Sequence, residues 1–180
     1  PTSVAASFGL PASVVTPHSV GLGIRGRVLA VHTPSVPEAD RPKRLDDLLN
    51  PRFRGKVAIA RPLFGTTSTH FAALHAQWGA AKFTEFLKAL KANGVMILPG
   101  NGDVRDAVVA GRAAVGLTDT DDAIGAIKRS QPLAMVFPDQ EADGMFGVYM
   151  TAAKVAGGPN PAGAQKLIEY LASEKTEARL

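Results

Sequence analysis

Short apolar runs alternate along the chain with segments whose apolar residues recur at helical spacing. Residues 80–92 show the helical pattern, because Phe83, Phe86 and Leu90 lie three or four positions apart. The apolar runs predict strands at residues 27–32, 56–60, 95–98, 113–117, 132–137 and 145–150, and the helical pattern covers residues 66–78, 80–92, 103–110, 123–129 and 161–173. This alternation predicts an α/β fold in which helices flank a mainly parallel sheet.

Three turns follow predicted strands and precede predicted helices, at residues 65–69, 100–103 and 119–122. The carboxyl ends of parallel strands lie at one edge of a sheet, which is where open α/β sheets bind ligands. We therefore expect these three turns to converge. By contrast, residues 1–24 show no helical period and predict a loop with one short strand.

The first turn reads Gly65-Thr66-Thr67-Ser68-Thr69 and places four consecutive hydroxyls at the start of a helix. The unpaired backbone N–H groups and the dipole of a helix N-terminus favour an anion there. A plain N-cap is the alternative, because Ser and Thr are favoured caps and one hydroxyl is enough for that role. The sequence leaves both interpretations open.

The second turn contains two glycines, which permit a close approach to a ligand, and Asn101 could offer its amide to that ligand. The alternative is a simple turn with Asp103 as the helix cap. Arg25 and Arg27, which flank Gly26 before the first clear strand, could face an anion or form a solvated strand edge.

The third turn is acidic and reads Asp119-Thr120-Asp121-Asp122. One aspartate is explained by helix capping and by the positive end of the helix, and a second is tolerable. A third within four positions points to a ligand, because hard cations take carboxylate oxygens in clusters of this kind. The sequence therefore predicts ligand contact for at least one of these residues.

The composition narrows the class of protein. Of the 180 residues, 46% are hydrophobic, which is enough for a packed core. The net charge of +4 comes from residues spread along the chain, and without a dense Lys/Arg block we expect no nucleic-acid binding. The absence of cysteine excludes disulfides, thiolate metal sites and cysteine nucleophiles. No apolar run approaches the roughly 18 residues of a membrane span.

Several segments form a combination typical of one family. They are residues 45–48 (Leu-Asp-Asp-Leu), 51–62 (Pro-Arg-Phe-Arg-Gly-Lys-Val-Ala-Ile-Ala-Arg-Pro), 64–67, 100–101 with 104–108, 116–122, and 161–179. Together they resemble the ABC-transporter solute-binding proteins of the periplasmic ferric-ion-binding type. The resemblance runs from about residue 23 to the end of the chain.

Members of that family have two α/β lobes joined by two hinge strands, with a solute bound in the cleft between the lobes. They are longer than this chain, which resembles their carboxyl-terminal portion. By this comparison, residues 1–33 are a remnant of the first lobe with the first hinge strand. Residues 34–144 form the second lobe, and residues 145–180 form the second hinge strand and the helix that returns to the first lobe.

The resemblance also implies an anion subsite. In ferric-binding members, the turn that matches Gly65-Thr66-Thr67 and the asparagine that matches Asn101 hold a small anion, such as carbonate, beside the iron. This implied role agrees with the interpretation of the first turn as an anion site.

The metal position is where this chain departs from the family. Asp121 and Asp122 occupy the position of an adjacent tyrosine pair that ligates Fe³⁺ in those proteins. The two tyrosines of this chain, Tyr149 and Tyr170, fall elsewhere. Carboxylates are hard oxygen ligands and still suit a cation. An amine-bearing or other organic solute is an alternative.

The residues together with the resemblance thus imply a lobe of a type 2 periplasmic binding protein, monomeric and without enzymatic activity, that delivers a small solute to an ABC permease of the inner membrane. The first candidate is ferric iron with a small anion, as transported ligand and not as cofactor. The predicted ligand-binding residues are Gly65, Thr66, Thr67, Asn101, Asp119, Thr120, Asp121 and Asp122, of which Thr66, Thr67 and Asn101, with Arg25, would hold the anion and Asp121 and Asp122 the metal.

The rival interpretation is a metal-dependent hydrolase or phosphotransferase that uses Asp119, Asp121 and Asp122 with Mg²⁺. Such an enzyme needs a general base or nucleophile beside the acids, and the sequence offers no convincing one.

Overall fold

The computed structural model describes residues 19–177, which divide into two compact units. One unit comprises residues 26–147, and the other comprises residues 1–25 with 148–180. The chain divides after residues 25 and 147, whereas the predicted boundaries follow residues 33 and 144, and the assignment of the parts to lobes of a longer protein stays a prediction. The portion of the predicted amino-terminal loop within residues 1–18 lies outside the described residues.

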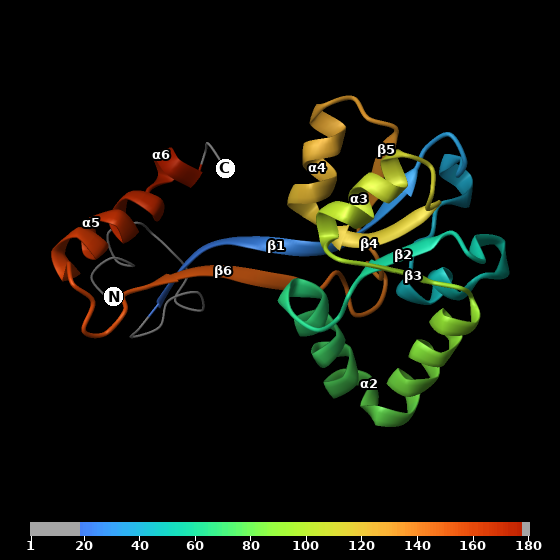
Figure 1. Cartoon of the computed structure of the whole chain (residues 1–180), viewed down its shortest axis with the longest axis horizontal. Helices are drawn as coiled ribbons and strands as arrows, with labels where there is room; N and C mark the ends of the chain where they lie inside the picture. The colour runs from blue at the N-terminus through green and yellow to red at the C-terminus, as the bar shows by residue number, and fades with distance from the viewer. Residues whose placement is uncertain (1–18, 178–180) are drawn as a thin grey trace. The chain divides into compact units, whose positions relative to one another are not determined.

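The unit of residues 26–147 is built on a sheet with the strand order β3-β2-β4-β1-β5 (Figure 1). The strands are β1 (Ser19–His32), β2 (Val57–Ala60), β3 (Met96–Leu98), β4 (Val115–Asp119) and β5 (Leu133–Val136). Strand β2 pairs in parallel with β3 and β4, whereas β1 pairs antiparallel with β4 and β5. The predicted α/β class is confirmed, and β1 is the one strand of these five that runs against the others.

Helices cover both faces of this sheet. Helix α2 (Gly65–Ala92) lies on one face, and α3 (Asn101–Val109) and α4 (Thr120–Lys128) lie on the other (Figure 1). Helix α2 is kinked at Gly79, whose φ of 79° is outside the helical range, and so it matches the two helices predicted for this region. Short 3₁₀ helices η2 (Glu38–Asp40), η3 (Leu45–Leu49) and η4 (Pro51–Phe53) join β1 to β2.

Strand β1 contributes to the core on both faces because its side chains alternate. Leu29 and Val31 pack in the cluster that includes residues of α2, and Val28 and Ala30 pack in the cluster that includes residues of α3 and α4. All four are fully buried. Since Arg27 is two positions from Leu29, its side chain shares the α2 face of the sheet.

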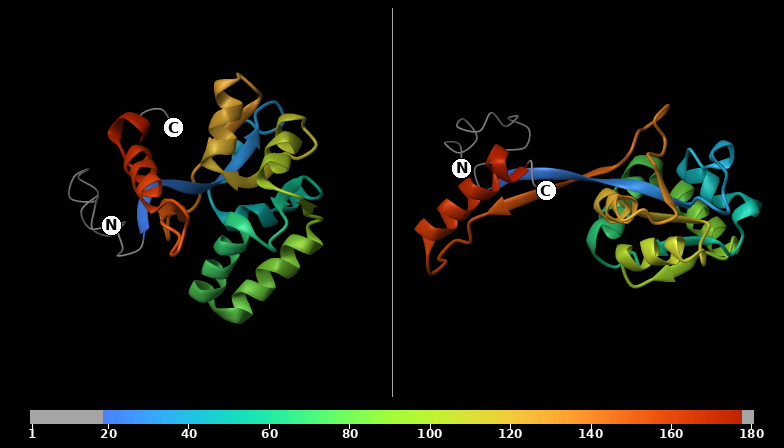
Figure 2. Two further views of the ribbon diagram at one scale, coloured as in Figure 1. Left: turned by 60° about the vertical axis from the view of Figure 1, so that its left-hand side comes forward. Right: turned by 90° about the horizontal axis from the view of Figure 1, so that it is seen from above.

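The second unit has its own small core. Residues 19–25 of β1 belong to it, and β1 pairs with β6 (Gly147–Ala153), as Figure 2 shows. Helix α5 (Pro161–Leu171) begins where predicted, capped by Asn160, whose side chain accepts a hydrogen bond from the Gly163 N–H at 2.8 Å. It is followed by α6 (Glu174–Glu177). Within residues 19–177, none of the helices combines the length and apolar character needed to cross a bilayer.

Candidate functional site

The three turns predicted to converge do meet. The Thr66 hydroxyl donates to Asp119 Oδ2 at 2.7 Å, and Asn101 Nδ2 donates to the same oxygen at 2.8 Å. Asn101 Nδ2 also lies 2.8 Å from Thr66 Oγ1. The reason is topological, because β2, β3 and β4 are parallel neighbours and their carboxyl ends therefore share one edge of the sheet.

Arg27 completes this polar cluster from the antiparallel strand β1. It lies directly opposite Asp119 in the β1–β4 register, and its Nη1 contacts Asp119 Oδ1 at 2.5 Å. Further hydrogen bonds run from Arg27 to Thr66 Oγ1 at 3.2 Å, to Asn101 Oδ1 at 3.1 Å and to Thr67 Oγ1 at 3.1 Å. Both charged side chains are almost completely buried, so these hydrogen bonds offset the loss of their hydration.

Of the two arginines that the sequence offered, Arg27 lies in this cluster, and the role of Arg25 as an anion contact stays a prediction. Arg25 lies on β1 within the other unit. The signal was present in the sequence, because Arg27 is in register with the buried positions Leu29 and Val31. A charged residue on the buried face of a strand requires a charged partner, and that partner is Asp119.

The helices that begin at this edge have no side-chain N-caps. The N-cap of α2 is Phe64, that of α3 is Gly100 and that of α4 is Asp119, and in none of the three does the side chain accept a capping hydrogen bond. This differs from the capping interpretation of the threonine turn and from the prediction that Asp103 caps α3. Instead, the carboxylate of Asp119 accepts hydrogen bonds from Arg27, Thr66 and Asn101.

Three helix N-termini therefore meet at one edge without side-chain caps. Each carries backbone N–H groups that have no partner within its own helix, and each presents the positive end of a helix dipole. The side chains of Thr66, Thr67 and Asn101 bond to one another, to Arg27 and to Asp119. The groups at this edge best suited to an anion are thus backbone N–H groups.

The remaining acidic residues lie on the first turn of α4. The carboxylates of Asp119, Asp121 and Asp122 offer oxygens that lie within 4.8 Å of one another, a spacing that could hold a metal ion. Asp121 is exposed and Asp122 half-buried. Thr120, at the same turn, accepts a hydrogen bond from the Gly26 N–H at 3.2 Å.

The protein environment alters the titration of Asp122. Burial raises the pKa of its carboxyl group, and the charge of neighbouring Asp121 raises it further. Arg105, 3.3 Å away, opposes this effect, and the Thr118 hydroxyl lies 3.4 Å from the carboxylate. A carboxylate that burial and a like charge both destabilise gains from a nearby cation.

His70 lies on α2, and its side chain packs in the interior of the protein. Its ring is buried and stacks on Phe146, with ring centroids 5.0 Å apart. Burial, aided by the charge of Arg27, lowers the pKa of His70 to about 3. His70 is therefore neutral at physiological pH.

An α/β lobe with three helix N-termini and an acidic cluster at the carboxyl edge of its sheet has the form of a ligand-binding lobe. A family model described as bacterial extracellular solute-binding protein matches residues 4–180, and the chain belongs to this family. The resemblance predicted from the sequence is thereby confirmed at the level of the family. A search of curated proteins found no significant match.

Solved structures of similar fold include ferric-binding proteins. Iron-bound HitA from Pseudomonas aeruginosa matches with a TM-score of 0.85 and 22% identity, over 99% of this chain and 58% of that one. Apo ferric ion-binding protein A from Pasteurella haemolytica matches with a TM-score of 0.81 and 25% identity, over 94% of this chain and 56% of that one.

A third structure is Trichodesmium IdiA (FutA) in complex with iron and citrate ligands. It matches with a TM-score of 0.80 and 22% identity, over 99% of this chain and 59% of that one. The chain therefore spans less than two thirds of the length of each of these proteins.

Proposed function

We propose that this chain is part of the solute-binding component of an ABC import system and that its solute binds at the edge where the three turns meet. The observation that carries the proposal is the convergence of three helix N-termini without side-chain caps beside the acidic turn of α4. Such an edge offers donors to an anion and carboxylates to a cation within one site.

The first candidate for the solute is ferric iron with a small anion. Asp121 and Asp122 would contact the cation, because Asp119 is engaged by Arg27, Thr66 and Asn101. The backbone N–H groups at Gly65, Thr66 and Thr67, and those at the start of α3, would contact the anion. The iron named for HitA and the iron and citrate named for FutA support this candidate.

The buried cluster of Arg27, Asp119, Thr66, Thr67 and Asn101 would act as the scaffold of the site. Its members form hydrogen bonds with one another, so their side chains hold the three turns in fixed relative positions before a solute arrives. A site that is ordered in advance loses less conformational entropy on binding. Thr120 would lie at the margin of the site through its contact with Gly26.

The remaining features of the proposal concern the whole protein. We infer that it makes and breaks no bond in its solute, and that affinity differs between an open and a closed state of an interlobe cleft. Membership of an extracellular solute-binding family implies a periplasmic or extracellular location, and we propose the periplasm. The partner would be a permease of the inner membrane, and the protein would act as a monomer.

A thermal-shift experiment tests the proposal. A solute that binds only the folded state stabilises it by about 2.7 kcal/mol at 100 times its Kd, and so raises the melting temperature. The panel contains ferric citrate, sodium citrate, calcium chloride, magnesium chloride and spermidine. We expect ferric citrate to raise the melting temperature and sodium citrate alone to raise it less.

Two variants localise any stabilisation. The double substitution Asp121→Asn and Asp122→Asn should abolish the shift, whereas Glu85→Gln, an exposed acid on α2, should retain it. If ferric citrate stabilises the double variant as much as the wild type, the site is wrongly placed. If spermidine or a divalent metal stabilises in its place, the site stands and the iron assignment fails.

The enzyme alternative has one supporting observation, the proximity of the three carboxylates. The ion pair between Asp119 and Arg27 counts against it, because that pair engages one of the three carboxylates. Incubation with p-nitrophenyl phosphate and Mg²⁺ separates the two functions. Turnover that disappears in Asp121→Asn would establish the enzyme and overturn the transport proposal.

A further inference from the structure

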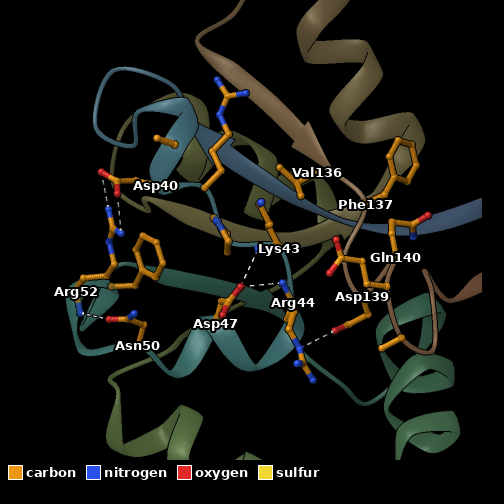
Figure 3. A pocket seen from close by; sticks show the side chains of 16 residues that line it. Asp40, Lys43, Arg44, Asp47, Asn50, Arg52, Val136, Phe137, Asp139 and Gln140 are labelled. Carbon is orange, nitrogen blue, oxygen red and sulfur yellow. Dashed lines mark hydrogen bonds and ion pairs between the residues drawn. The ribbon is translucent and has the colours of Figure 1, made fainter.

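A cavity of about 700 Å³ lies in the unit of residues 26–147 and has no lining residue in common with the proposed solute site. Its walls come from residues 39–53, which include η2, η3 and η4, and from residues 136–142, which follow β5 (Figure 3). This volume falls in the range of cavities that hold small organic ligands. The charged side chains around it show what kind of ligand would fit.

Three of the acids in the cavity wall are already engaged within the protein. Asp40 pairs with Arg52, with Oδ2 and Nη2 3.0 Å apart. Asp47 Oδ2 accepts hydrogen bonds from the backbone N–H groups of Lys43 at 2.7 Å and Arg44 at 2.9 Å. Figure 3 shows these contacts as dashed lines.

The third engaged acid is Asp139. It accepts a hydrogen bond from the Leu45 N–H at 3.3 Å and lies 3.7 Å from Arg44 Nε. Burial raises the pKa of its carboxyl group above the ordinary value. Glu141 is the remaining acid of the wall, and its side chain is exposed.

Two cations of the wall, by contrast, have no acidic partner among residues 19–177. They are Arg41 and Lys43, whose side chains make no hydrogen bond or ion pair with these residues. Arg41 is partly buried, and its Nε is a buried donor without an acceptor in this part of the chain. Between them, a guanidinium and an ammonium supply up to eight N–H donors. The four basic and four acidic side chains of the wall balance in formal charge, and Arg41 and Lys43 leave the cavity with donors that have no acceptor among residues 19–177.

Part of the remaining wall is apolar, and Asn50 and Gln140 add amide groups. Phe53 is buried, with the guanidinium of Arg52 5.1 Å from its ring centroid, and Phe137 is 44% exposed. Val136 lies beside Phe137 in the wall. The wall segment of residues 39–53 is held to the core through Leu48, which is fully buried. Apolar side chains beside polar groups that fix the orientation of a ligand are a usual feature of small-molecule sites.

We propose that this cavity binds a small organic anion, whose carboxylate or similar group contacts Arg41 and Lys43 and whose apolar part lies against Phe53, Val136 and Phe137. The anion pairs with two cations that have no acidic partner among residues 19–177, and its apolar part contacts the aromatic and aliphatic side chains of the wall. This site does not depend on the solute site, since the two have different residues.

Isothermal titration calorimetry with phthalate, an aromatic dicarboxylate, tests the proposal. Dimethyl phthalate, which has the same ring without the charges, is the matched ligand control. We expect phthalate to bind with a Kd in the range of about 10 μM to 1 mM and the neutral ester to bind at least about tenfold more weakly.

Substitutions then locate the binding. Arg41→Ala with Lys43→Ala should weaken phthalate binding by about tenfold or more, whereas the same loss of charge at Lys88 and Lys91, two exposed positions of α2, should leave it unchanged. Glu141→Gln should strengthen binding by about two- to threefold, because it removes a repulsive charge. If the double variant at positions 41 and 43 does not fold, Lys43→Gln alone should still weaken binding.

Several outcomes would overturn the proposal. One is that phthalate gives no heat at millimolar concentration. Another is that phthalate and dimethyl phthalate bind with the same affinity. A third is that phthalate binds the wild type and the variants at positions 41 and 43 equally. A glutamate-rich peptide that binds where phthalate does not would also overturn it, and would indicate a protein partner instead of a small molecule.

Discussion

Replacing Arg27 by methionine tests whether one buried ion pair holds the three turns together. The substitution keeps an unbranched apolar stem and removes the guanidinium. Breaking a buried pair by removing one partner costs about 3–5 kcal/mol, because the other charge stays buried without compensation. Asp119 would keep two donors, Thr66 Oγ1 at 2.7 Å and Asn101 Nδ2 at 2.8 Å. We therefore expect a loss near the lower limit, about 3 kcal/mol.

Urea unfolding followed by the fluorescence of Trp78 measures this loss. Trp78 is the single tryptophan of the chain and lies on α2, in the same unit as the ion pair. Asp119→Asn alone should also destabilise, because it leaves Arg27 buried without an anion. Combined with Arg27→Met it should cost less than the sum, with a coupling energy of about 2 kcal/mol.

The result that would refute this reasoning is a loss below about 1 kcal/mol for Arg27→Met, or losses that simply add in the double variant. Either would mean that the contact between Arg27 and Asp119 contributes little to holding the edge. The scaffold would then have to rest on the hydrogen bonds among Thr66, Thr67 and Asn101 alone.

Three further predictions concern pH and packing. Because the pKa of Asp122 is raised in the folded state, its contribution to stability is present at acid pH and is lost as pH rises through that pKa. The melting temperature of Asp122→Asn should therefore increase relative to that of the wild type as the pH approaches neutral. The pH dependence that His70 contributes has the opposite sign, because its pKa is lowered to about 3 in the folded state. Stability should fall as pH drops from 6.5, where the unfolded state begins to take up the proton. The melting temperature of His70→Leu should fall less over the same range. At Gly116, an added Cβ would lie 2.5 Å from Val104 Cγ1, so Gly116→Ala should cost about 1–3 kcal/mol in urea unfolding, whereas Gly125→Ala on α4 should cost little.

The parts of the fold that the sequence predicted are those encoded by local patterns. The apolar runs at β2, β3 and β4 and the helical spacing of α2 follow from burial on one face, and the kink at Gly79 falls between the two helices expected there. The convergence of the turns followed from topology alone. The reversed direction of β1 did not, because strand direction depends on pairing with distant residues.

At the site, the sequence identified the positions but not their bonding. Threonine and asparagine side chains at helix starts predicted caps or anion contacts, whereas in the structure they bond to Arg27 and Asp119. That partnership joins residues 92 positions apart, and no local pattern encodes it. The alternation of β1 held the available signal, since Arg27 shares a face with Leu29.

The most direct test of the account is where a bound solute lies. Crystals of the protein grown with ferric citrate, with diffraction measured at the iron absorption edge, would show the metal as an anomalous peak. The account predicts this peak within bonding distance of the carboxylate oxygens of Asp121 or Asp122, with the anion at the N-termini of α2 and α3. An ordered iron bound elsewhere, with this edge of the sheet unchanged, would contradict it.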